Sequence, residues 1–217
     1  MPPILQALTL TLCAMLFAPL SWAAPAVPYV QSLAADWDDV KYKWQKDKRA
    51  QGFEAVAARA AQAAAAHPGE AAPLVWQGIA LASQAGEDGG LSALGLVKRA
   101  KEVLEQAEKL DPDSLSGSIY TTLGSLYYQV PGWPLGFGDS DKARQYLQKA
   151  LAANPAGLDA NYFWGDFLME QGDYAAAIAA FEKALQAPPR ADRPLADAGR
   201  REEAQARLAK SRQLLRP

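Results

Sequence analysis

The sequence is almost without cysteine and histidine: among its 217 residues there is one of each, Cys13 and His67. A single cysteine forms no intramolecular disulfide and no multi-thiolate metal site. A single histidine gives no histidine-rich metal site and only one candidate base for a catalytic triad. Because His67 directly precedes Pro68, we expect it to cap the C-terminus of a helix. We therefore expect a protein that is not an enzyme and that has no catalytic residue, no metal and no cofactor.

The chain also lacks an excess of charge of one sign, since 22 Lys and Arg residues face 24 Asp and Glu residues. Nucleic acids attract their partners mainly through a basic field, so we expect no nucleic-acid partner. An enzyme that works with carboxylates alone is the alternative to a binding protein, and Asp36, Asp38 and Asp39 are its clustered candidates. Acidic residues of this kind also suit the first turn of a helix, which is the interpretation we favour.

Charged residues are absent from the apolar run 4–20, which is followed by Ser21-Trp22-Ala23. This pattern predicts a secretory signal peptide over 1–23, cleaved after Ala23, and hence a periplasmic protein. The alternative is an uncleaved N-terminal anchor. Residues 24–28 hold two prolines and are expected to form a linker. Cys13 would leave with the signal peptide.

A sequence motif occurs three times: a small residue, a large apolar residue, a second small residue and a proline. Its copies are Ala100-Leu104-Ala107-Pro112, Ala143-Leu147-Ala150-Pro155 and Ala177-Phe181-Ala184-Pro189. Self-similarity at such intervals indicates stacked structural units. We expect one helical domain over 29–217, with repeats at 36–68, 71–112, 117–155 and 158–189 and a cap at 191–215.

Apolar residues recur at spacings of three and four rather than two, which predicts helices and no strand. The first repeat is expected to contain helices over 36–49 and 53–66. In the cap, Leu195, Ala198, Ala204 and Leu208 are expected to form an apolar stripe beneath a polar outer face, as the end of an open stack requires. The predicted fold class is all-α: a right-handed α-solenoid of helical hairpins with a C-terminal capping helix.

Small residues at regular positions are expected to let paired helices approach closely, because glycine and alanine hold neighbours apart least. This pattern in 161–189 resembles the tetratricopeptide repeat (TPR), which implies a hairpin stack that binds a partner on its inner face. The residues expected to pack the repeats are Gly78, Ala100, Ala107, Gly124, Ala143, Ala150, Gly165, Ala177, Phe181 and Ala184. The groove residues that the resemblance implies are Thr121, Ser125, Tyr128, Gln129, Tyr162, Asp166, Met169 and Glu170.

Two insertions interrupt the repeats at the same joint, within 83–96 and 131–138, and we expect two loops side by side on one edge. Trp133, Leu135 and Phe137 then form an apolar interface on the second loop. The alternative is that the loop folds back as a lid over the repeat core.

The stretch 110–168 is similar to the periplasmic TPR-like T-component (TatT) family associated with TRAP transporters. The shared features are Leu123-Gly124, Leu126-Tyr127, Val130-Pro-Gly132, Gly138-Asp139, Lys142-Ala143, Pro155 and Asn161. This resemblance implies a transport accessory that cooperates with a solute-binding protein and can form a homo-oligomer. We expect a non-catalytic periplasmic scaffold for a protein or peptide partner. The alternative is a carrier of a small hydrophobic ligand or organic acid that works with such a transporter.

Overall fold

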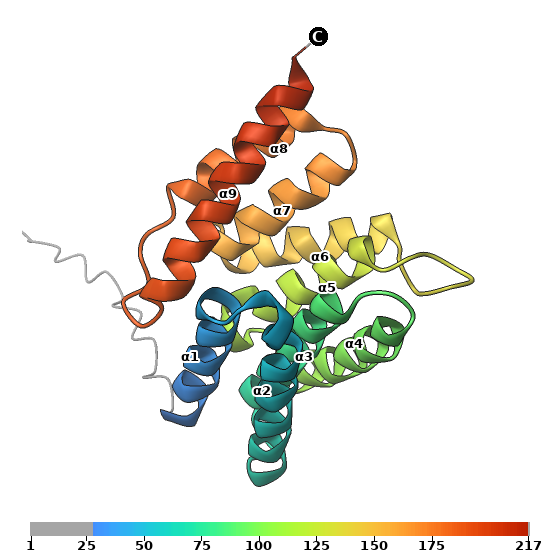
Figure 1. The fold of residues 1–217 in the computed structure, drawn as a ribbon, viewed down its shortest axis with the longest axis vertical. Helices are drawn as coiled ribbons and strands as arrows, with labels where there is room; N and C mark the ends of the chain where they lie inside the picture. Colours follow the sequence, from blue (N-terminus) through green and yellow to red (C-terminus); the bar gives the residue numbers. More distant parts are fainter. Residues whose placement is uncertain (1–27, 217) are drawn as a thin grey trace, which may run out of the picture.

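The computed structural model describes residues 28–216, and the segments expected to be the signal peptide and most of the linker lie outside this range. Within it the chain forms nine α-helices, one short 3-10 helix and no strand (Figure 1). The elements are α1 (Pro28–Lys43), α2 (Lys46–Ala66), α3 (Ala71–Asp88), α4 (Ser92–Leu110), η1 (Ser114–Gly117), α5 (Ser118–Gln129), α6 (Ser140–Ala153), α7 (Leu158–Glu170), α8 (Tyr174–Leu185) and α9 (Pro194–Leu215). The fold is all-α, as predicted.

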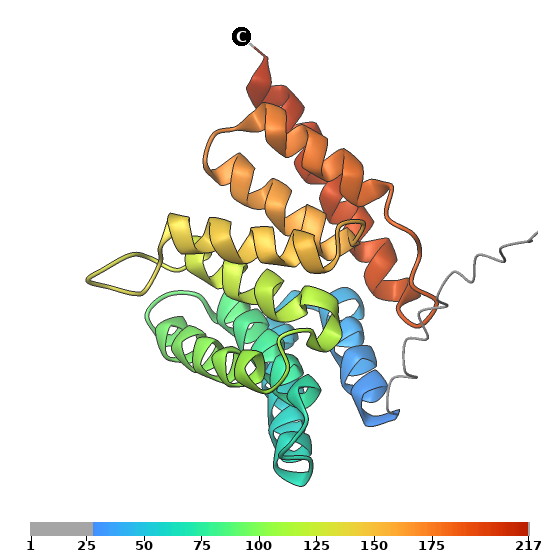
Figure 2. The ribbon, with the colours of Figure 1, turned by 180° about the vertical axis from the view of Figure 1, so that it is seen from behind.

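Successive helices pack as hairpins that stack into a curved α-solenoid (Figures 1 and 2). One apolar core cluster is built from α1 to α5 and a second from α5 to α8 together with α9. The two clusters meet at α5, where Leu123 and Leu126 belong to the first and the neighbouring Tyr127 to the second. The curvature turns the odd-numbered helices toward a common centre.

The same glycine contact joins the two helices of three consecutive hairpins. A Cβ on Gly78 would lie 2.5 Å from Leu104 Cγ, and one on Gly124 would lie 2.7 Å from Leu147 Cγ. In the third hairpin Phe181 takes the place of the leucine opposite Gly165. The alanines that the sequence places on these interfaces are fully buried: Ala100, Ala107, Ala143, Ala150, Ala177 and Ala184. The recurring sequence motif therefore corresponds to a close approach of the two helices in each hairpin.

The first hairpin differs from the expected helices over 36–49 and 53–66. Helix α1 ends at Lys43 and α2 begins at Lys46, so the turn falls earlier and Gly52 lies inside α2. A Cβ on Gly52 would lie 2.8 Å from the Val40 methyl groups, so this glycine serves a close helix contact rather than a chain break. The first helix also begins at Pro28, one residue into the expected linker, since proline is tolerated in a first helical turn.

The clustered Asp36, Asp38 and Asp39 therefore lie in the second half of α1, so the first-turn interpretation was wrong. They diverge around the helix: Asp36 pairs with Arg59 of α2, Asp38 is buried, and Asp39 is exposed. Because the three carboxylates do not converge, they form no catalytic cluster.

The first insertion forms no loop comparable with the second. It extends α3 to Asp88, and α4 begins at Ser92, so only residues 89–91 connect the two helices. The second insertion is a true hairpin loop over 131–138, which projects from the stack between α5 and α6 (Figure 1). Of the two neighbouring loops that were expected, the first is a short turn and the second is the projecting loop 131–138.

Helix α9 covers α8 and also reaches α1, so the last helix does more than cap the stack. Its expected apolar stripe was half right, because Ala204 and Leu208 are buried while Ala198 is exposed. The buried inner side instead includes the charged residue Arg200. The ring of Tyr42 from α1 packs directly against Gly199, where a Cβ would collide with that ring.

Candidate functional site

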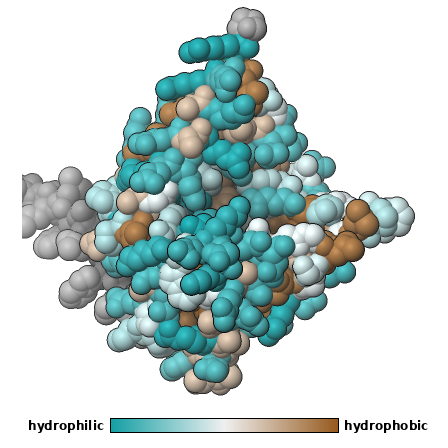
Figure 3. Space-filling model, in the orientation of Figure 1, coloured by the Kyte–Doolittle hydropathy of each residue, from teal (hydrophilic) through white to brown (hydrophobic). Residues whose placement is uncertain are grey.

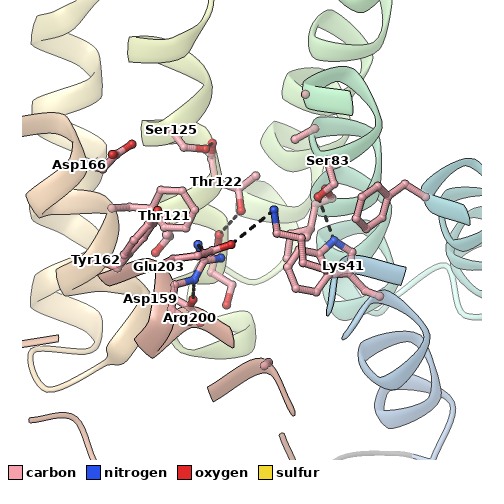
Figure 4. Close-up of a pocket in the computed structure, with 18 of the residues that line it drawn as sticks. Lys41, Ser83, Thr121, Thr122, Ser125, Asp159, Tyr162, Asp166, Arg200 and Glu203 are labelled. Atoms are coloured by element: carbon pink, nitrogen blue, oxygen red, sulfur yellow. Dashed lines mark hydrogen bonds and ion pairs between the residues drawn. The ribbon is translucent and has the colours of Figure 1, made fainter. Parts of the chain in front are cut away.

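A cavity of about 330 Å³ lies at the centre of the curve, where α1, α3, α5, α7 and α9 face one another. Figure 4 shows that its labelled side chains come from all five helices and point inward. A volume of this size falls at the lower end of the range for small-ligand sites, about 300–1,000 Å³. The inner surface of the solenoid therefore holds a partly open hollow that all five helices line.

Contacts between α1 and α9 close one side of the cavity. Arg193, directly before α9, donates hydrogen bonds through Nε and a terminal nitrogen to the buried Asp38 of α1. Lys41 Nζ lies 3.6 Å from Glu203 Oε1 of α9. Burial raises the pKa of Asp38, and the Arg193 guanidinium opposes that shift. The first and last helices are thus held together by two ion pairs.

Asp159 of α7 lies between two arginines. Its Oδ1 accepts a hydrogen bond from Arg200 Nε at 2.9 Å, and its Oδ2 accepts one from Arg190 at 2.8 Å. Burial alone would raise the pKa of Asp159, but Arg200 and Arg190 outweigh it and hold the pKa at about 2. Arg200 also donates to Glu203 at 2.6 Å, so one guanidinium joins two carboxylates.

Asp166, one of the predicted groove residues, lies two helical turns further along α7 than Asp159. Its Oδ2 accepts a hydrogen bond from Tyr128 Oη at 2.7 Å, and its Oδ1 lies 3.1 Å from Arg207 Nε of α9. That Oδ1 atom is buried and has no partner of hydrogen-bond geometry among the described residues. Burial and the nearby Asp166 carboxylate raise the pKa of Tyr128, which stays protonated and donates.

The wall formed by α5 carries hydroxyl groups whose protons are donated within the helix. Thr121 donates its proton to the Gly117 carbonyl at 3.1 Å, and Thr122 donates to the Ser118 carbonyl at 2.8 Å. Ser125 donates to the Thr122 carbonyl at 2.8 Å. Since each hydroxyl has a single proton, the oxygen that faces the cavity offers lone pairs only.

Aromatic rings from α1, α3 and α7 complete the lining. Trp37 donates from Nε1 to Ser83 Oγ at 2.9 Å (Figure 4), whereas the buried Trp76 Nε1 has no partner among residues 28–216. Trp76 also borders a second hollow of about 380 Å³. Arg193 lies over Trp76 at 5.0 Å and Arg200 over Tyr162 at 4.4 Å, so cation–π contacts join the arginines to the rings.

Five of the eight predicted groove residues line the cavity, namely Thr121, Ser125, Gln129, Tyr162 and Asp166. Tyr128 lies beside it through its bond to Asp166. Met169 packs against the core cluster of the C-terminal half, and Glu170 is exposed at the end of α7, so the structure places neither in the lining.

Sequence reasoning missed the contribution of the two terminal helices to this site. It gives the cap an apolar stripe and a polar outer face, yet Arg193, Arg200 and Arg207 line the cavity. Their spacing of seven residues, about two helical turns, is the signal that places them on one face. The same spacing separates their partners Asp159 and Asp166 on α7.

The hairpin 131–138 separates its three predicted interface residues. Trp133 is 90% exposed and Leu135 is 62% exposed, and Figure 3 shows apolar side chains on a tip that projects from a mostly hydrophilic face. Phe137 instead turns inward and meets Tyr127 edge-on at 5.5 Å. The loop therefore exposes Trp133 and Leu135 and packs Phe137 against the repeat core, and the interface stays a prediction.

His67, the single histidine of the sequence, is the C-cap residue of α2. Its ring stacks on Tyr29 at 4.5 Å, and its Nδ1 lies 3.5 Å from Glu70. Within the described part of the chain, no group of three or more His, Cys, Asp or Glu side chains is placed to hold a metal ion. No helix among residues 28–216 is long and apolar enough to cross a membrane.

The fold and sequence both have counterparts among known proteins. Residues 135–192 match the family model of the tetratricopeptide repeat. The structure of TTC0263, a thermophilic TPR protein from Thermus thermophilus, is similar with a TM-score of 0.53 and 16% identity, over 82% of this chain and 99% of that one. These two findings support a TPR protein, a class whose members generally bind protein partners and are generally non-catalytic scaffolds.

The structure of MamA from AMB-1 is also similar, with a TM-score of 0.47 and 25% identity, over 87% of this chain and 98% of that one. A crystal structure of MamA shows a TM-score of 0.44 at 24% identity. No curated protein matches the sequence.

Proposed function

We propose that this protein is a non-catalytic periplasmic scaffold that binds a protein partner through the hairpin 131–138. The observation that carries the proposal is the exposure of Trp133 and Leu135 on a loop that is held in shape. Exposed tryptophan is typical of the few side chains that dominate a protein interface. A loop presented by a rigid scaffold is also a common place for such residues.

Backbone hydrogen bonds fix the hairpin in its shape. Gly136 N donates to Gly132 O at 3.1 Å, and Gly138 N donates to Pro131 O at 3.0 Å. A Cβ on Gly138 would collide with the Val130 carbonyl oxygen, so glycine is required there. A loop that is ordered before binding loses less conformational entropy when a partner docks.

The periplasmic part of the proposal rests on the signal-peptide pattern at 1–23. The T-component (TatT) resemblance over 110–168 includes the Pro-Gly insertion, which forms this hairpin. It supports a transport accessory whose partner is a periplasmic solute-binding protein. N-terminal sequencing of protein from a periplasmic fraction tests the location: an N-terminus at Ala24 agrees with it, and an intact N-terminus in the membrane fraction contradicts it.

The partner surface is tested by cross-linking in producing cells, with a double variant that carries Trp133→Ser and Leu135→Ser. The control is Leu110→Ser, because Leu110 is an apolar residue that is 49% exposed at the other end of α4, away from this loop. The proposal predicts that a defined cross-linked partner is lost from the double variant and kept in the control. Equal cross-linking in both variants contradicts it. If self-association measured by gel filtration is lost instead, the partner is a second copy of the chain.

A second candidate function, a carrier of a small ligand, is favoured by the partly open cavity of about 330 Å³. Native mass spectrometry of freshly purified protein tests this function. A co-purified small molecule supports the carrier, and protein of the bare chain mass contradicts it.

A further inference from the structure

The charges that line the cavity are already paired with one another. Its four cations each lie beside a carboxylate, in the pairs Lys41–Glu203, Arg193–Asp38, Arg200–Asp159 and Arg207–Asp166. A ligand with a net charge would leave one charge without compensation in this partly open site, which is unfavourable. The lining therefore favours a ligand with no net charge.

Four of these charged side chains form a continuous polar row, Lys41–Glu203–Arg200–Asp159. Lys41 Nζ lies 3.6 Å from Glu203 Oε1, and Arg200 donates to Glu203 Oε2 at 2.6 Å (Figure 4). Arg200 also donates to Asp159 Oδ1 at 2.9 Å. The side chains of Lys41, Glu203 and Asp159 are 28%, 30% and 31% exposed, so a ligand in the cavity can touch them. Donors and acceptors alternate along the polar row.

An alternating row of donors and acceptors suits a ligand that is rich in hydroxyl groups. A hydroxyl donates one hydrogen bond and also accepts, so neighbouring hydroxyls can each bridge a cation and a carboxylate of the row. Such bonds are stronger than those between neutral groups, because one partner is charged. A purely apolar ligand would instead remove water from the row without replacing its hydrogen bonds, which is unfavourable.

Apolar side chains also belong to the lining, and one of them lies beside the polar row. Phe163 of α7 is half-buried, and the Arg200 guanidinium lies 4.8 Å from the centre of its ring. Ile79 and Ala82 of α3 are half-buried lining residues as well. A sugar combines the two properties that this lining requires, because hydroxyl groups surround its ring and C–H groups cover the ring faces. Burial of those C–H groups against an apolar side chain adds to the binding free energy.

We propose that the cavity binds a neutral sugar of one or two rings. The sugar hydroxyls donate to Glu203 and Asp159 and accept from Lys41 and Arg200, and a C–H face of the ring packs on Phe163. A cavity of about 330 Å³ lies at the lower end of the range for small-ligand sites, which suits one or two rings rather than a polysaccharide. This proposal rests on the second candidate function, the carrier, and is independent of partner binding by the hairpin.

The test is isothermal titration calorimetry on the processed full chain after unfolding and refolding, so that any co-purified molecule has been removed. The probes are glucose, galactose and maltose, with glucuronate and glucosamine as an anionic and a cationic counterpart of glucose. The proposal predicts that at least one neutral sugar binds and that both charged sugars bind at least about tenfold more weakly than it does. No binding of any of the three neutral sugars overturns the proposal. Binding of glucuronate as tight as that of the best neutral sugar also overturns it and indicates an organic-acid site.

Two variants place the bound sugar in the cavity. Glu203→Gln removes the carboxylate at the centre of the polar row, and Phe163→Ala removes the apolar face, while circular dichroism confirms that each variant is folded. We expect the affinity to fall at least about tenfold for the first variant and severalfold for the second. Glu202→Gln makes the same chemical change at the neighbouring, exposed position of α9 and should leave the affinity unchanged. Equal affinity of Glu203→Gln and Glu202→Gln overturns the location.

Native mass spectrometry of freshly purified protein separates failure of this proposal from failure of the carrier function. A co-purified molecule with the mass of a neutral sugar supports both. A co-purified molecule of another class supports the carrier and overturns the sugar. Protein of the bare chain mass that also binds no neutral sugar contradicts both.

Discussion

Gly165 of α7 faces the ring of Phe181 of α8 so closely that an added Cβ would lie 2.9 Å from Phe181 Cδ1 and Cε1. The ring is fully buried and cannot move aside without displacing its own neighbours. This contact replaces the glycine–leucine contact of the two preceding hairpins, so the two helices of each hairpin approach each other at a glycine in all three.

We predict that Gly165→Ala destabilises the protein by about 1–3 kcal/mol, because the new methyl group overpacks the interface with Phe181. Urea unfolding followed by circular dichroism measures the change. Gly95→Ala is the matched control, since Gly95 is an exposed residue of α4 with no atom within 4 Å of its added Cβ. The control should stabilise the protein by about 0.5–1 kcal/mol. Changes of equal sign in both variants would contradict this explanation of Gly165.

Asp139 closes the hairpin loop by capping α6. Its Oδ1 accepts hydrogen bonds from the backbone N–H groups of Asp141 and Lys142, each at 3.0 Å. We predict that Asp139→Ala costs about 0.5–2 kcal/mol of unfolding free energy, as for other lost N-caps. Asp139→Asn retains an oxygen acceptor and should cost clearly less. If thermal unfolding shows the same loss for both variants, the side chain acts otherwise than as a cap.

The lowered pKa of Asp159 makes the stability of the fold depend on pH. In the unfolded chain an aspartate has a pKa of about 3.9, whereas Arg200 and Arg190 hold the folded value at about 2. The ionised carboxylate therefore stabilises the fold fully above about pH 4, and this contribution is lost as the pH falls toward 2. We predict that Asp159→Asn lowers stability at pH 7 and flattens its fall between pH 4 and pH 2. Unfolding curves with the same slope in both proteins would contradict the assignment.

The packing of the repeats could be predicted from the sequence because it depends on local spacing. Within each hairpin the small residues and the large apolar residue are close in sequence, and one helical period brings them to one face. The repeat expected at 158–189 contains the hairpin of Gly165 and Phe181, because α7 runs over Leu158–Glu170 and α8 over Tyr174–Leu185.

Gly52 shows where the helix bounds cannot be predicted locally. A glycine can end a helix or can let a neighbouring helix pack closely, and the sequence does not distinguish the two. The insertion within 83–96 posed a similar ambiguity, since extra residues can lengthen two helices as easily as they form a loop. In both places the contact with the adjacent helix decides the outcome.

The cavity could not be predicted because it joins residues that are far apart in the chain. Asp38 and Arg193 are separated by 155 positions, and they meet only after the curvature of the whole stack has accumulated. A sequence pattern identifies one face of α9 but not what that face meets. The sequence therefore predicted a solvent-exposed face for the charged residues of α9.

Contact between the first and last helices is the central claim, because it brings the two ends of the stack together beside the cavity. The most direct measurement is the distance between spin labels on α1 and α9, placed at the exposed positions Asp39→Cys and Glu202→Cys of the processed chain and read by double electron–electron resonance. The account predicts one narrow distribution at short distance, which broadens toward longer distances when Arg193→Ala removes the pair with Asp38. A broad distribution at long distance in the protein that retains Arg193 would contradict it.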